Sequence, residues 1–215
     1  MSSDCSIENC YNTGSVVSTG YVNTNHGTFV GGIVGNTIGN VSRCYNNAEI
    51  NSIYANAGGI VGYSSSNITF CYNTGKVVVT DGNLDGNSIA GGIAGNITGG
   101  TIEMCYNTGD VVASKNIAGG IAGISNNTTY IKKSYNVGNI SANNIIGNII
   151  ARDAGKVNNT GVANIENCYY LGTKTENQER TSDDMKTSEF INLLGGENYW
   201  KIETNVNSGY PTLKL

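Results

Sequence analysis

The chain has 215 residues, of which only 13% are charged, and its net charge of −4 leaves it without the basic footprint that nucleic-acid binding requires. Apolar residues make up 39% of the chain, which excludes wholesale disorder, and no apolar run reaches the roughly 18 residues of a membrane span. We therefore expect a folded protein with no nucleic-acid partner and no membrane span in this chain.

Two short phrases alternate along the first 172 residues. Copies and variants of the phrase Cys-Tyr-Asn-Thr-Gly begin at Cys10, Cys44, Cys71, Cys105, Ser134 and Cys168. Copies of the phrase Gly-Gly-Ile-Val-Gly, or its Ala variant, begin at Gly31, Gly58, Gly91 and Gly119, and a degraded copy surrounds Gly147. Phrases that return every 27 to 34 residues are the signature of a solenoid, in which each repeat stacks on the next.

The repeats are rich in Val, Ile, Tyr, Thr, Asn and Gly and poor in strong helix formers, so strands are expected. A coil of this length suits a three-sided parallel β-helix, in which each side supplies one short strand and a turn. The sequence therefore predicts an all-β domain over residues 1–172, a right-handed parallel β-helix of about five to six coils. Extra residues at 18–29, 80–88 and 152–163 are expected to form loops outside the stack.

Stacked coils turn each repeat position into a column of like residues. Inward-pointing columns are expected at Ile7, Val41, Ile68, Ile102, Ile131 and Ile165, at Val16, Ile50, Val77, Val111 and Ile140, and at Ile33, Ile60, Ile93, Ile121 and Ile149. The Cys or Ser of the first phrase is expected to point inward, and its Tyr outward, because side chains alternate along a strand. Its Asn is expected at a turn, where stacked amides bond along the axis.

Residues 173–215 have a different character and are predicted to form a small α/β capping segment. Thr181-Ser182-Asp183-Asp184 looks like a helix start and Gly195-Gly196 like its end, which predicts a helix over about 182–194. A final strand is expected over about 210–215. We expect this segment to act as a lid over the last coil, where it would shield the core and block strand addition.

The combination of CYNTG-x-V with AGGI(A/V)G resembles the GLUG-motif repeats over about residues 5–172. The ending Trp200…Gly209-Tyr210-Pro211-Thr212-Leu213 is similar to the terminal segment of such arrays. The resemblance implies a place among large secreted or surface proteins of Gram-positive and anaerobic bacteria, which include IgA-specific metallopeptidases and adhesin-like proteins. In those peptidases the repeats accompany a separate catalytic domain, and the His-Glu-x-x-His zinc motif of that domain does not occur in this sequence.

The outward tyrosines form the candidate binding site. The column consists of Tyr11, Tyr45, Tyr72, Tyr106 and Tyr135 and is continued by Tyr169. A stripe of exposed rings can contact sugar faces or a partner protein, so a glycan or a host protein is the expected partner. The alternative is that the rings stack on one another and only stabilise the solenoid.

The cysteine column is interrupted by Ser134, which favours a small buried side chain over thiol chemistry. Disulfides between neighbouring coils and metal ligation are the alternatives, although no Cys-x-x-Cys pair occurs.

Asp81, Asn83 and Asp85 match the first half of a calcium loop, D-x-N-x-D-G. The acid expected six residues after Gly86 is replaced by Gly92, and Asp, Asn and Gly are ordinary turn formers. Calcium is the one cofactor that the sequence suggests.

Catalytic residues are not evident. His26 is the only histidine, and the mixed charges of Glu49, Lys76 and Asp110 at one repeat position are typical of a solvated surface. We expect a non-catalytic module of an extracellular or cell-surface protein, a stalk, adhesion or binding segment within a larger chain, with the long loops as recognition elements. The alternative is a polysaccharide lyase or hydrolase built on a β-helix.

Overall fold

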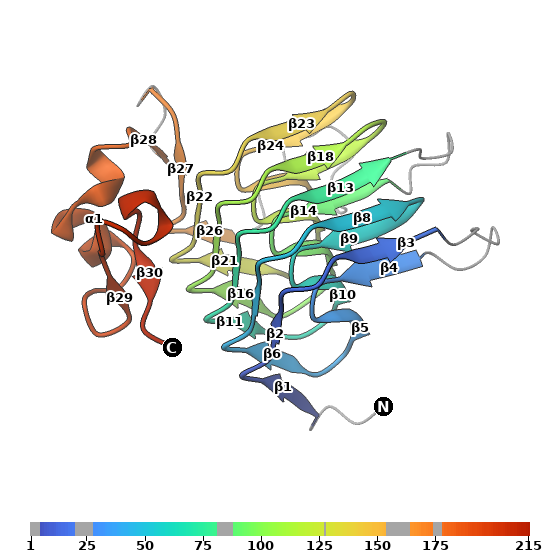
Figure 1. The fold of residues 1–215 in the computed structure, drawn as a ribbon, viewed down its shortest axis with the longest axis horizontal. Helices are drawn as coiled ribbons and strands as arrows, with labels where there is room; N and C mark the ends of the chain where they lie inside the picture. The colour runs from blue at the N-terminus through green and yellow to red at the C-terminus, as the bar shows by residue number, and fades with distance from the viewer. Residues whose placement is uncertain (1–4, 20–27, 81–87, 127, 154–163, 174–177) are drawn as a thin grey trace.

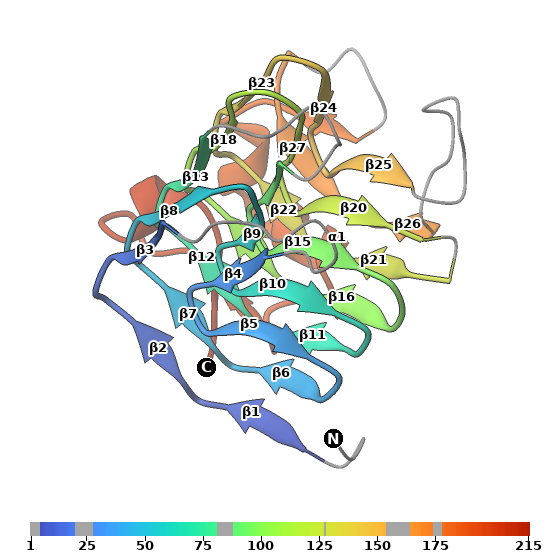
Figure 2. The same ribbon diagram turned by 90° about the vertical axis from the view of Figure 1, so that its right-hand side faces the viewer.

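The computed structural model describes residues 5–19, 28–80, 88–126, 128–153, 164–173 and 178–215. Within these residues, five parallel sheets run along the molecule, and each coil contributes one strand to each sheet (Figure 1). Figure 2 shows the coils stacked so that each strand lies beside its counterpart in the next coil. Five complete coils and the first strands of a sixth are present, which confirms the predicted parallel β-helix.

We name the sheets A to E in the order in which the chain visits them. Sheet A contains β1 (Ser6–Glu8), β6 (Asn40–Ser42), β11 (Ile68–Thr69), β16 (Thr101–Glu103), β21 (Tyr130–Lys132) and β26 (Asn164–Glu166). Sheet B contains β2 (Tyr11–Asn12), β7 (Tyr45–Asn46), β12 (Tyr72–Asn73), β17 (Tyr106–Asn107), β22 (Tyr135–Asn136), β27 (Tyr169–Leu171) and β28 (Glu179–Arg180). Sheet C contains β3 (Val16–Ser18), β8 (Ile50–Ile53), β13 (Val77–Thr80), β18 (Val111–Ala113) and β23 (Ile140–Ala142).

Sheets D and E complete each coil. Sheet D contains β4 (Thr28–Gly31), β9 (Ala55–Gly58), β14 (Ile89–Gly91), β19 (Ile117–Gly119) and β24 (Ile145–Gly147). Sheet E contains β5 (Val34–Thr37), β10 (Val61–Ser64), β15 (Ala94–Ile97), β20 (Ala122–Ser125) and β25 (Ile150–Asp153). The predicted three strands per coil are therefore wrong, because sharp bends divide the coil into five strands.

Two of these bends recur at fixed repeat positions. The bend between sheets A and B is a residue in the left-handed conformation, with φ between 46° and 55°, just before the Cys or Ser of each coil. The residues at this bend are Asn9, Arg43, Phe70, Met104, Lys133 and Asn167. The bend between sheets D and E is the Gly-Gly pair. The polar pairs at this place, such as Ser42-Arg43 and Lys132-Lys133, predict a corner of the coil. Its left-handed conformation was not foreseen, because most of the residue types found there carry no sequence signal for it.

The bends create two main cores in each coil. One lies between sheets A and E, where Ile68 and Ile102 meet Ile60 and Ile93 together with the cysteine column. The other lies between sheets C and D and is formed by the Val77 column against small alanines. The three Ile and Val columns expected to point inward are buried through the middle coils, so the predicted inward pattern is confirmed there.

A ladder of asparagines separates the two cores. Each amide Nδ2 donates to the Oδ1 of the asparagine in the next coil at 2.8 Å, through Asn12, Asn46, Asn73, Asn107 and Asn136. The second glycine of each Gly-Gly pair makes room for this ladder: a Cβ at Gly59 would lie 2.3 Å from Cγ of Asn73. The expected amide bonding along the axis is confirmed, and the interior amides of this ladder have partners for both Nδ2 and Oδ1.

The C-terminal segment contains a 3₁₀ turn η1 (Asp184–Lys186), helix α1 (Ser188–Leu193), a second 3₁₀ turn η2 (Asn207–Gly209), and an antiparallel pair, β29 (Trp200–Lys201) and β30 (Thr212–Leu213). The helix is shorter than predicted because Thr187 is extended and caps α1 by accepting a hydrogen bond from the Phe190 amide at 3.2 Å. The final strand covers two residues of the predicted range.

The position of this segment differs from the expectation. Only β28 adds to the last coil, by pairing with β27. The remainder lies beside the stack, against the outer face of sheet B, as Figure 1 shows. The reason is apolar burial: Met185, Phe190 and Trp200 pack against tyrosines of sheet B. Of the helices that the structure describes, none has the length and apolar character needed to cross a membrane.

Candidate functional site

The tyrosine column of sheet B is a stack of parallel rings. Successive ring centroids lie 5.3, 4.9, 4.8 and 5.2 Å apart along Tyr11, Tyr45, Tyr72, Tyr106 and Tyr135. The interplanar angles are 9° for the first pair and 3° for the others. The strand register produces this geometry, because each tyrosine pairs directly with the tyrosine of the next coil.

The stacking decides which part of each ring can meet a ligand. Both faces of Tyr72 are occupied, one by Tyr45 and the other by Tyr106. A sugar cannot lie flat on such a ring, so the expected contact with sugar faces is restricted to the outer face of Tyr11. The ring edges and the phenol hydroxyls are what the stack presents outward.

The C-terminal segment covers one half of the stack. Tyr135 is fully buried, and Tyr106 and Tyr169 are 3% and 7% exposed, whereas Tyr11 is 65% exposed. Trp200 lies over the covered half, with its ring 5.8 Å from Tyr135 and 6.1 Å from Tyr106. The structure therefore brings the five predicted tyrosines together but leaves only part of the stripe open.

The hydroxyl of Tyr135 fastens the segment to the ladder. It donates to the carbonyl of Pro211 and accepts a hydrogen bond of 3.0 Å from Nδ2 of Asn207. Burial raises the pKa of this phenol well above its usual value, and the charge of Tyr106 would raise it further. The phenol therefore stays neutral and keeps its hydrogen bonds over the physiological range.

A groove of about 670 Å³ remains where the C-terminal segment leaves the ladder. One wall consists of the ladder residues Tyr45, Asn47, Tyr72, Thr74 and Tyr106. The opposite wall comes from the C-terminal segment and consists of Lys201, Glu203, Val206, Asn207, Thr212, Leu213, Lys214 and Leu215. We call this space the ladder groove. Its volume lies within the range of about 300–1,000 Å³ that small-molecule sites usually have.

The second wall of the ladder groove was missed in the sequence. A signal for it was present in the repeat: Phe70 and Met104 stand at a bend position that is polar in Asn9, Arg43 and Asn167. Phe70 contacts the ring of Tyr199 at 5.8 Å, and Met104 is buried under the segment. Apolar residues at positions that are otherwise polar thus outline where the segment lies.

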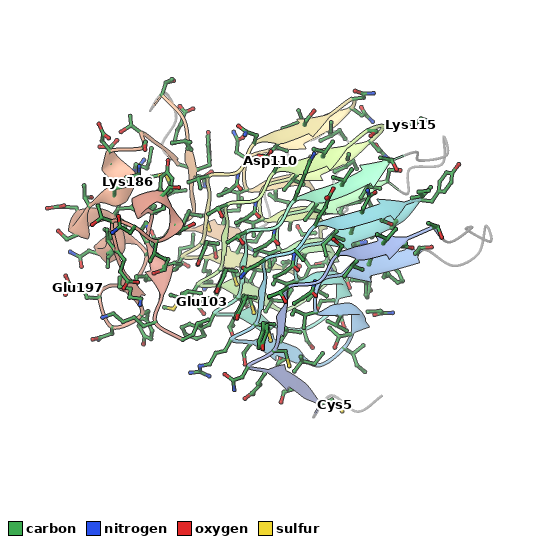
Figure 3. All side chains as sticks on the ribbon, in the orientation of Figure 1. Cys5, Glu103, Asp110, Lys115, Lys186 and Glu197 are labelled. Carbon is green, nitrogen blue, oxygen red and sulfur yellow. The ribbon has the colours of Figure 1, made fainter. Side chains whose placement is uncertain are left out.

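The mixed charges of Glu49, Lys76 and Asp110 follow one another on successive coils, since each precedes one of the paired strand residues Ile50, Val77 and Val111. Asp110 accepts two hydrogen bonds from Asn139 of the next coil, at 3.1 and 3.0 Å, and so serves as a surface link between coils. Elsewhere on the surface, Glu103 and Lys133 form an ion pair of 3.3 Å. Figure 3 shows Asp110 and Glu103 on different parts of the coil surface. Both carboxylates have the partners that are typical of a solvated surface.

The cysteine column is a structural ladder. Cys44, Cys71, Cys105 and Cys168 are buried thiols, and Cys44 donates to the carbonyl of Ser42 at 3.1 Å. Ser134 makes the same bond to the carbonyl of Lys132 at 2.7 Å, which explains why serine fits this column. Burial raises the pKa of Cys168 to about 12, so its thiol is protonated and not nucleophilic at neutral pH.

The predicted calcium ligands Asp81, Asn83 and Asp85, and His26, lie outside the described residues, so calcium binding stays a prediction. In the part of the chain that the structure covers, no three His, Cys, Asp or Glu side chains come together as a metal site. Most of the residues predicted to form the three long loops also lie outside the described part of the chain. The strands on either side belong to sheets C and D for the first two predicted loops, and to sheets E and A for the third.

The coil of five parallel strands, closed by a Gly-Gly bend and held by Tyr, Asn and Cys ladders, defines a parallel β-helix built from one recurring unit. The family model described as the GLUG motif matches residues 86–112, which span β14 to the middle of β18. The predicted resemblance to GLUG-motif repeat proteins is thereby confirmed.

A crystal structure from Bacteroides ovatus, of a protein provisionally named an immunoglobulin A1 protease, is similar to the whole solenoid. The match has a TM-score of 0.57 and 18% sequence identity, and it covers 97% of this chain and 75% of the other. At this identity the likeness concerns the fold alone. No curated protein matches the sequence.

Proposed function

We propose that this chain is a non-catalytic β-helix module of a secreted or cell-surface protein, which acts as a rigid spacer and as a binding segment. The observation that carries the proposal is the uninterrupted register of five sheets, in which the polar side chains of one coil bond to the next. The Asn12-to-Asn136 ladder and the Asp110–Asn139 link are examples. These polar side chains bond one coil to the next, which suits a rigid spacer.

The comparisons support an extracellular setting. GLUG repeats and a fold shared with a protein provisionally named an immunoglobulin A1 protease fit a module that accompanies other domains outside the cell. Among the described residues, no three His, Cys, Asp or Glu side chains come together as a metal site. We therefore place any catalytic role of a parent protein in other domains and assign display and binding to this one.

Incubation of the full chain with a panel of plant, microbial and host polysaccharides tests the proposal, with release of reducing ends and of unsaturated uronates as readouts. We expect no turnover. Turnover that is lost in Asp110→Asn or Lys76→Met would overturn the proposal in favour of the polysaccharide lyase or hydrolase. Ser65→Ala is the matched control, because Ser65 is exposed between sheets E and A, whereas Lys76 and Asp110 lie between sheets B and C.

A further inference from the structure

The ladder groove contains phenol hydroxyls that the protein does not use. Among the described residues, the hydroxyls of Tyr45, Tyr72 and Tyr106 have no hydrogen-bond partner, in contrast to that of Tyr135. Tyr106 is almost wholly buried and lines the groove. On the opposite wall, Oγ1 of Thr212 is buried and has no hydrogen-bond partner among the described residues. A buried hydroxyl without a partner carries a free-energy cost that a ligand hydroxyl would remove.

The phenols are suited to neutral hydroxyl ligands. Burial, and secondarily the neighbouring phenol of the ladder, raises the pKa of Tyr72 and of Tyr106. A neutral phenol both donates and accepts a hydrogen bond, as a sugar hydroxyl does. Beside them, Thr74 donates to Oδ1 of Asn47 at 2.9 Å, which leaves the amide Nδ2 of Asn47 to serve as a donor.

The spacing of the ladder indicates the kind of chain that would fit. The rings of Tyr45, Tyr72 and Tyr106 follow one another at 4.9 and 4.8 Å. This interval is close to the length of one pyranose unit in an extended β-linked glycan. An extended oligosaccharide along the solenoid axis could therefore meet one phenol edge and one hydroxyl per sugar.

The charged side chains of the groove already have partners. Lys201 forms an ion pair with Glu203 at 2.8 Å, and the ammonium of Lys214 donates to the carbonyl of Glu197. A ligand without charge would leave both contacts in place. The ladder wall is also unsuited to strand addition by a peptide, since the amides of Tyr72 and Thr74 already donate to carbonyls of the preceding coil.

We propose that the ladder groove binds a neutral, unbranched, β-linked oligosaccharide through the hydroxyls of Tyr45, Tyr72 and Tyr106. The inference rests on the proposed function as a binding module and assigns it a ligand class and a place. The ligand lies in the ladder groove against the ring edges, and the C-terminal segment forms its second wall.

Titration of the full chain by amide NMR tests the inference, with the β-1,4-linked tetrasaccharides of glucose and of N-acetylglucosamine as probes. We expect at least one of them to bind, and Tyr72→Phe to weaken its affinity about two- to tenfold, as the loss of one neutral hydrogen bond implies. Tyr11→Phe is the matched control, because Tyr11 belongs to the same ladder but does not line the groove, and its affinity should equal that of the wild type.

Three results would overturn the inference: no binding of either tetrasaccharide, equal losses in Tyr72→Phe and Tyr11→Phe, or tighter binding of a tetragalacturonate or a proline-rich peptide. The outcome separates the two proposals. Binding accompanied by cleavage would overturn the non-catalytic function and keep the groove. Absence of both binding and cleavage would overturn the groove and keep the non-catalytic function.

Discussion

The covered and the open halves of the tyrosine ladder have the same backbone and the same residue but opposite surroundings. Tyr135 is a core residue under Phe190 and Trp200, with a hydroxyl that is fully bonded. Tyr11 stacks on one neighbour and is otherwise open to solvent. A repeat position therefore specifies the conformation of its residue, and the segment packed on it decides whether that residue stabilises the fold or is free to bind.

Truncation of the ladder should produce the greatest contrast between the halves. Tyr135→Ala removes a fully buried ring and leaves Asn207 without one partner, so we expect a loss of about 3–5 kcal/mol in unfolding free energy. Tyr11→Ala removes one ring stack and should lose about 1 kcal/mol or less. Urea unfolding monitored by circular dichroism measures both, and equal losses would show that the C-terminal segment does not bury the ladder.

The asparagine ladder should show a smaller contrast. Asn107→Ala removes one of the two hydrogen bonds of Asn73 Nδ2, which keeps the Gly75 carbonyl, and one of the two of Asn136 Oδ1, which keeps the Gly138 amide. Because these losses fall in the interior, the unfolding free energy should drop by about 2–4 kcal/mol. Asn12 lies at the partly exposed first coil, where water can replace the lost bond, so Asn12→Ala should lower it by about 1 kcal/mol. The urea midpoints of the two variants test this, and a larger loss in Asn12→Ala would contradict it.

Alkaline pH should weaken the packing of the C-terminal segment on Tyr135. Burial raises the pKa of Tyr135 in the folded protein, whereas a phenol in the unfolded chain ionises near pH 10. The contribution of Tyr135 is therefore complete below about pH 10 and falls as the pH rises above it. The urea midpoint, followed by the fluorescence of Trp200, should fall with rising pH, and less steeply in Tyr135→Phe. If the urea midpoint of Tyr135→Phe fell as steeply with pH as that of the wild type, the pH dependence would not come from Tyr135.

Substitutions in the inward cysteine column should have the smallest effect on stability. Cys105→Ser places a hydroxyl where Ser134 already shows a satisfied one, so the loss should be about 1 kcal/mol or less. Cys105→Leu overfills the same site and should lose about 1–3 kcal/mol. Thermal unfolding compares the two, and a serine variant as unstable as the leucine variant would imply that the sulfur itself is required.

Much of the fold could be predicted because the repeat imposes its own register. The columns of Ile68, Val77 and Ile93, and the inward cysteines, follow from periodicity, since a column must be uniform to stack. The left-handed bend could not be predicted, because it is occupied by residues as different as Phe70 and Lys133 and is imposed by packing of the coil. The stacking of Asn107 between its neighbours could also be predicted, because asparagine recurs at the same position of each repeat.

The candidate site was predicted only in part. The tyrosine stripe follows from alternation along the strand, but its covering depends on contacts between residues far apart in the chain, such as Tyr135 with Pro211. A sequence contains no periodic signal for such contacts. Comparison of the bend residues across coils, with Phe70 and Met104 set against Arg43, would have revealed the docking face before the structure.

The common register also gives the molecule a constant rise per repeat. Each coil presents the same edges on its two sides and adds about 4.8 Å along the axis, whatever its loops contain. Gain or loss of one repeat would change the reach of the protein by one such step and leave the joints between the remaining coils intact. The distance at which a binding surface is held can therefore be adjusted in whole steps by duplication or deletion of a single unit.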